Sequence, residues 1–306
     1  MQSHLQHFEL GDIELLSGEF LPDAALAYCT YGELNPDKDN AVLLPTFYTG
    51  SHIRNEGFFG AGRAIDPAKH FVVSVNMFGN GFSSSPSNAA VPVNGPNFPE
   101  ISLYDNVFCQ HRLLSEIFGI DRIRLVAGWS MAGCQAYQWA AQFPEMVEAI
   151  LPFCASARTS PHNFVFLEGV KAALTADQNF RSGHYDSPPE SGLKAFARVY
   201  AGWAFSQSFY REGLFRNLGF ETPEDLLKDW EDDHLNWDAN NLLAKLRTWQ
   251  TADISANPLY GGDFQLALSA IQAKTIVIAS SSDLYFTPED NKLEVRQMQN
   301  AELRIY

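Results

Sequence analysis

The sequence predicts a mostly parallel, doubly wound α/β sheet with a helical cap inserted into it. Three observations lead to this fold class. Short apolar runs rich in β-branched residues alternate with helical segments up to about residue 160. A helical, aromatic-rich region follows, and a β-branched run returns at residues 273–283. Alternating strands and helices favour a parallel sheet, and a chain of 306 residues that is 46% apolar can bury a large core.

The first part of the core is expected at residues 1–160. It begins at residues 7–34, where apolar and polar residues alternate in a pattern typical of antiparallel strands. Short apolar runs that end in turn residues predict strands buried on both faces at residues 40–47, 70–79, 123–129 and 147–156. Helical periodicity is found at residues 106–120, and a helix of small residues at 131–144 ends at Pro144.

The pattern changes at about residue 160. Residues 161–262 are helical and aromatic, with polar interruptions, and we interpret them as the inserted cap. The sheet resumes in residues 263–306, the second part of the core, whose last six residues again have the pattern of a strand.

The net charge of −15 makes the surface acidic. Such a surface repels phosphate backbones and anionic lipids, so neither nucleic acid nor a membrane is an expected partner. Residues 1–20 lack the basic and apolar regions of a signal peptide. The four cysteines are scattered and have no metal-ligand spacing, which is typical of reduced thiols. We therefore expect a cytoplasmic protein without a metal site.

The segment GWSMAG, residues 128–133, stands between a predicted strand and a predicted helix. A nucleophile elbow needs this context, because its tight turn requires small residues two before and two after the serine. Ser130 would be the nucleophile, held in a strained conformation, and the backbone N–H of Met131 would be an oxyanion donor at the helix N-terminus. The simpler alternative is that Ser130 only caps the helix.

A serine hydroxyl needs a base to take its proton and a carboxylate to orient that base. In an elbow of this kind the chain order is serine, acid, histidine, and the acid follows a late strand. Asp283 has that position, although a turn or helix-cap role is the alternative. The eight histidines all precede Asp283: His4, His7, His52, His70, His111, His162, His184 and His234.

These segments together resemble the homoserine O-acetyltransferase family and its esterase-like relatives, within the α/β-hydrolase superfamily. GWSMAG resembles the family's elbow G-G-S-M-G-G, and SDLYFTP, residues 282–288, resembles its acid segment S-D-x-x-F-P. WDANNLL, residues 237–243, resembles the F-D-A-N segment of the family's cap, and residues 102–120 resemble its helix before the elbow.

The resemblance implies an α/β-hydrolase fold, a homodimer through the cap helices, and further site residues. In the segment TFYTG, the backbone N–H of Tyr48 takes the position of the second oxyanion donor. Arg198 takes the position of the family's carboxylate-binding arginine, and Phe205 replaces its tyrosine partner. The family's histidine follows a strand that AELRIY resembles, past Tyr306. We therefore expect the C-terminal part of the fold to be missing from the chain, and residues 1–306 to be inactive without the base.

Three functions remain open at this stage. The first is hydrolysis of a small carboxylic ester through an acyl-Ser130 intermediate, with no cofactor. The second is O-acetyl transfer from acetyl-CoA to homoserine or a similar alcohol. The third is a non-catalytic binding protein on this fold. The altered pocket positions and the acidic surface favour hydrolysis. His52, near the predicted oxyanion loop, is a candidate for substrate contact, against the alternative of a structural loop histidine.

Overall fold

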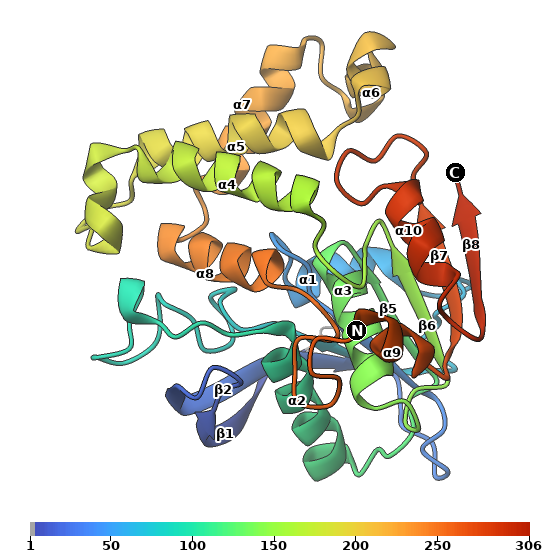
Figure 1. Ribbon diagram of the computed structural model, residues 1–306. Coiled ribbons are helices and arrows are strands. Elements are labelled where there is room, and N and C mark those ends of the chain that lie inside the picture. Colours follow the sequence, from blue (N-terminus) through green and yellow to red (C-terminus); the bar gives the residue numbers. More distant parts are fainter. Residues whose placement is uncertain (1–3) are drawn as a thin grey trace.

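An eight-stranded sheet runs through the computed structural model, which describes residues 4–306 (Figure 1). The strand order is β1-β2-β4-β3-β5-β6-β7-β8. The strands are β1 (Gln6–Glu14), β2 (Phe20–Tyr31), β3 (Ala41–Pro45), β4 (Phe71–Val75), β5 (Leu125–Trp129), β6 (Ala149–Phe153), β7 (Lys274–Ala279) and β8 (Ala301–Ile305). β2 is antiparallel to β1 and β4, and all other neighbours are parallel. The predicted fold class is confirmed.

The central strands are buried on both faces, as their apolar runs predicted. β3 and β4 have no exposed residue. Successive side chains of a strand point to opposite faces of the sheet. On one face, Leu43 packs in the same core cluster as residues of α2 and α3. Val42 and Leu44 point the other way, toward Phe59 and Ile65.

Ten α-helices occur in the described part of the chain. They are α1 (His52–Asn55), α2 (Leu103–Arg112), α3 (Met131–Gln142), α4 (Pro161–Thr175), α5 (Glu190–Ala204), α6 (Gln207–Arg211), α7 (Pro223–His234), α8 (Ala239–Gln250), α9 (Phe264–Ser269) and α10 (Pro288–Val295). The helix predicted at residues 106–120 begins earlier, at Leu103. A capping box forms there, because the Ser102 hydroxyl accepts from the Asp105 N–H and the Asp105 carboxylate accepts from the Ser102 N–H. Its second half, Leu113–Ile117, is π-helical.

Helices α4 to α8 come between β6 and β7, and Figure 1 shows them together above the sheet, with α8 nearest to it. Residues that leave the core and residues that return run side by side. The N–H of Thr159 donates to the carbonyl of Ala252, and the N–H of Ile254 donates to that of Ala157. The last of these five helices, α8, ends at Gln250, and turns make up most of residues 251–262.

Within residues 4–306, none of the helices combines the length and apolar character needed to cross a membrane. In the same residues, no three histidine, cysteine, aspartate or glutamate side chains are arranged to hold a metal ion. Cys29, Cys109, Cys134 and Cys154 form no disulfide with one another.

Candidate active site

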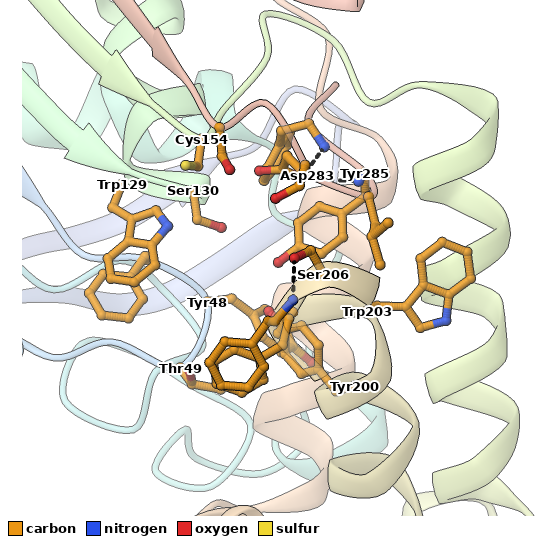
Figure 2. A pocket seen from close by; sticks show the side chains of 18 of the residues that line it. Tyr48, Thr49, Trp129, Ser130, Cys154, Tyr200, Trp203, Ser206, Asp283 and Tyr285 are labelled. Atoms are coloured by element: carbon orange, nitrogen blue, oxygen red, sulfur yellow. Dashed lines mark hydrogen bonds between the residues drawn. The ribbon is translucent and has the colours of Figure 1, made fainter. Parts of the chain in front are cut away.

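Ser130 occupies a strained corner between β5 and α3. Its φ of 56° and ψ of −129° lie outside the regions that L-residues normally adopt, a strain that costs of order 1–3 kcal/mol. The Ser130 side chain makes no capping bond to the helix, so the N-cap alternative does not describe it. The hydroxyl instead lies at the wall of a cavity (Figure 2).

Small residues on both sides of Ser130 make this corner possible. A Cβ on Gly128 would lie 2.5 Å from the Cβ of Ala132, and a Cβ on Gly133 would lie 2.6 Å from the Cβ of Ala155. Both distances are far below an ordinary carbon–carbon contact of about 3.5–4.0 Å. The sequence pattern small-x-Ser-x-small thus has a steric cause in this chain.

The loop after β3 forms a turn beside the corner. The N–H of Gly50 donates to the carbonyl of Phe47 at 2.9 Å, so Tyr48 and Thr49 are the middle residues of the turn. The Tyr48 ring is buried and its hydroxyl donates to the carbonyl of Leu242 on α8 at 2.7 Å. Met131 is the first residue of α3, where backbone N–H groups lack partners within the helix.

Asp283 lies in the turn between β7 and α10. Its Oδ1 accepts hydrogen bonds from the N–H groups of Tyr285, at 3.0 Å, and Phe286, at 2.8 Å. Burial raises the pKa of Asp283 above its ordinary value, although these two bonds and the neighbouring Cys154 thiol act in the opposite direction. Figure 2 shows Asp283 across the cavity from Trp129, with the Ser130 hydroxyl pointing between them.

The cavity has a volume of about 720 Å³ and an aromatic lining. Phe47, Phe58, Trp129, Tyr200, Trp203, Phe205, Phe209, Trp230, Tyr285 and Phe286 contribute rings to it. Sequence reasoning missed most of these residues. Of these ten residues, the resemblance had indicated Phe205 alone. Trp129 could have been found from its place directly before Ser130, and it is 47% exposed.

None of the histidines in the described residues lines this cavity. His52 is buried, and its ring lies 3.4 Å from the Asn76 amide oxygen and edge-on to Phe82. The prediction that His52 contacts substrate therefore does not fit the structure, because Asn76 draws the ring inward. His234 is also buried, with Nδ1 against the carbonyl of Trp230.

Arg198 is also outside the cavity lining, contrary to the expectation from the resemblance. Its guanidinium pairs with Glu224 and Glu231, two carboxylates of α7, which hold it on the side of α5 that faces α7. Phe205, in contrast, lies in the cavity wall and stacks on Phe209 with ring centroids 4.3 Å apart. The structure thus brings together Ser130, Asp283, Tyr48 and Phe205, but neither Arg198 nor His52.

Known proteins share this architecture and sequence. The chain is 38% identical over 299 residues to the ethyl acetate hydrolase of Pseudomonas veronii, covering 96% of this chain and 85% of that protein. It superposes with a TM-score of 0.95 on an acetylester hydrolase from Corynebacterium glutamicum, at 36% identity, over 99% of this chain and 87% of that one. It is also 30% identical over 298 residues to the homoserine O-acetyltransferase of Chloroherpeton thalassium, covering 93% of this chain and 78% of that protein. Residues 42–305 match the family model of the alpha/beta hydrolase fold, and the chain belongs to that family.

Proposed function

We propose that this protein is a serine hydrolase that cleaves small, uncharged carboxylic esters through an acyl-Ser130 intermediate. The observation that carries the proposal is the conformation of Ser130, whose strained backbone directs a hydroxyl without a capping bond to an aromatic cavity. Strain of this kind clusters at functional sites, where it holds a reactive group in place before the substrate binds. The ethyl acetate and acetyl ester hydrolases among the relatives give independent support.

The lining of the cavity favours an uncharged substrate. Among the described residues, Arg54 is the one arginine or lysine in the lining, and its guanidinium pairs with Asp233. An anionic substrate would have to compete with that carboxylate. Aromatic rings offer apolar contact to a short acyl chain and a small alcohol group without requiring charge.

In the proposed reaction the Ser130 oxygen attacks the ester carbonyl carbon while a base takes the hydroxyl proton. The N–H groups of Tyr48 and Met131 would hold the developing oxyanion, with each such donor worth about 3–4 kcal/mol in comparable sites. The bond between the carbonyl carbon and the alcohol oxygen breaks, and the alcohol leaves with the proton. Water then attacks the acyl-serine, its proton returns to Ser130 through the base, and the carboxylic acid is released.

The base is a separate part of the proposal. Asp283 would accept a hydrogen bond from an imidazole and orient it toward Ser130. Since no histidine of the described residues lines the cavity, we propose that a histidine outside residues 1–306 fills this role. Residues 1–306 alone would then retain only the catalysis of the oxyanion donors and binding, about 10³–10⁴ over water in hydrolases that lack triad members.

The second candidate is transfer of an acetyl group from acetyl-CoA to homoserine or a similar alcohol. The homoserine O-acetyltransferase relative favours it, and the acyl-enzyme would be the same. The ion pairs of Arg198 weigh against it, because the cation expected to bind the homoserine carboxylate is already neutralised by Glu224 and Glu231.

The test is a parallel assay of the complete gene product. Acetate release from ethyl acetate is followed beside thiol release from acetyl-CoA, with and without homoserine. We expect acetate release that Ser130→Ala abolishes, and no thiol release that depends on homoserine. Thiol release that requires homoserine would establish the transferase instead. For the location of the protein we propose the cytoplasm, supported by the four cysteines, which form no disulfide with one another.

A further inference from the structure

Lys245 is a buried amine that the proposed reaction does not use. It lies in the middle of α8 with 0% of its surface exposed. Its Nζ donates a hydrogen bond to the backbone carbonyl of Tyr48 and lies 4.1 Å from the centroid of the Trp237 ring. No carboxylate of the described residues forms an ion pair with Lys245 at 4.0 Å or less. Burying an ammonium group against neutral partners is costly, so its position calls for an explanation.

The carbonyl that Lys245 binds belongs to the middle peptide of the turn beside Ser130. Gly50 and Phe47 close this turn, and the peptide between Tyr48 and Thr49 is its centre. Type I and type II turns differ chiefly in the orientation of this middle peptide. In a trans peptide the C=O and the N–H point in opposite directions. A cation that holds the Tyr48 carbonyl toward α8 therefore also turns the Thr49 N–H away from α8.

The same helix binds the turn at a second point, through the bond from the Tyr48 hydroxyl to the Leu242 carbonyl. Leu242 and Lys245 are three residues apart and lie on one face of α8. Both bonds reach Tyr48, and Tyr48 and Thr49 both line the cavity next to Ser130. The cap helix α8 thus fixes both the side chain and the backbone of the turn.

From this geometry we infer that Lys245 is a positioning residue. Its ammonium holds the middle peptide of the Phe47–Gly50 turn in one orientation, and this fixes the place of Tyr48, whose own N–H is the proposed oxyanion donor. The inference rests on the proposed function, since the turn needs to be held only if a negative charge develops beside it. Positioning of a donor affects the transition state more than the bound ester, because the charge is largest there.

The groups around Lys245 make this device sensitive to pH. Burial, with a smaller contribution from the Arg54 guanidinium, lowers the pKa of Lys245 to about 7. The other titratable groups nearby are the Tyr48 phenol and, on α7, His234 and Asp233. Burial lowers the pKa of His234, and Asp233 pairs with Arg54. The charged form of Lys245 is therefore present below about pH 7 and is lost as the pH rises through that value.

The experiment compares Lys245→Met with Thr248→Val in the complete gene product, using 4-nitrophenyl acetate as substrate. Thr248 is a matched control, because it is also buried on α8 and donates to a backbone carbonyl, that of Ile101, outside the cavity. We expect Lys245→Met to lower kcat by about 10- to 100-fold with KM within threefold, because misplacing an oxyanion donor affects the transition state. Thr248→Val should leave kcat within twofold of wild type.

The pH profile supplies a readout that a merely structural role would not change. In the wild type, kcat should fall on the alkaline side with an apparent pKa near 7, and Lys245→Met should lose this descent. If Lys245→Met does not fold, Lys245→Leu takes its place in the same comparison, and a kcat equal to that of the wild type overturns the inference. Equal kcat in Lys245→Met and wild type also overturns it, while leaving ester hydrolysis intact. A wild type without hydrolysis that depends on Ser130 overturns the proposed function and this role with it.

Discussion

Gly128→Ala should distort the corner that carries Ser130. The new Cβ would lie 2.5 Å from both the Cβ and the carbonyl carbon of Ala132, and 2.7 Å from its carbonyl oxygen. Because two of these three atoms belong to the backbone of α3, no side-chain rotation relieves the clash. Reaching an ordinary contact requires a shift of about 1 Å between β5 and α3. Overpacking of this kind costs about 1–3 kcal/mol of stability. Displacing a nucleophile by about 1 Å costs on the order of 100-fold in rate.

The assay measures both consequences. Urea unfolding followed by tryptophan fluorescence gives the change in stability, and kcat/KM with 4-nitrophenyl acetate gives the change in activity. Gly169→Ala, on α4, is the matched control, because a Cβ there meets no atom within 4 Å. Better helix propensity should stabilise Gly169→Ala by up to about 1 kcal/mol, with unchanged activity. A Gly128→Ala variant with wild-type stability and activity would refute the steric account of the corner.

Three further expectations concern the cavity wall, the cap ion pairs and the core. Trp129→Ala should shift the ester preference toward bulkier acyl groups. It should lower the free energy of unfolding by about 2–3 kcal/mol, because about half of the residue is buried. An unchanged ranking of esters would argue against its place in the cavity wall. Arg198→Ala should leave KM for small esters within twofold of the wild type, because the Arg198 guanidinium binds Glu224 and Glu231 and not the substrate. A tenfold rise in KM would show that Arg198 contacts the substrate. Burial raises the pKa of Glu294 from 4.5 to about 7, so between these pH values the folded chain binds a proton that the unfolded chain releases. The free energy of unfolding should therefore fall as the pH rises through this range. Urea titrations at pH 5 and pH 8 should show a smaller difference for Glu294→Gln than for the wild type.

The sheet and the elbow were predictable because each depends on local pattern. β-branched runs such as those of β3 and β4 identify buried strands, and the spacing of Gly128, Ser130 and Ala132 reflects a steric requirement within one turn. The position of Asp283 followed from the strand before it. All of these inferences need only residues that are neighbours in sequence.

The cavity lining and the partners of charged side chains were not predictable in this way. Arg198 matched a family position, but α7 supplies Glu224 and Glu231 from a later segment, and no pattern near Arg198 indicates them. His52 is turned inward by Asn76, which comes from the end of another strand. Lys245 sits in an ordinary helical stretch, and only the docking of α8 on the Tyr48 turn sets it apart. Such contacts depend on how distant segments meet.

The central claim is that Ser130 is the nucleophile of an ester hydrolase. Its most direct test is the reaction of the complete gene product with diethyl 4-nitrophenyl phosphate, which transfers a diethyl phosphoryl group to an activated serine and releases 4-nitrophenol. Peptide mapping by mass spectrometry then locates the label. We predict one label per chain on Ser130, loss of ester hydrolysis in step with labelling, and no label in Ser130→Ala. Labelling at another residue, or full hydrolysis after Ser130 is labelled, would contradict the account.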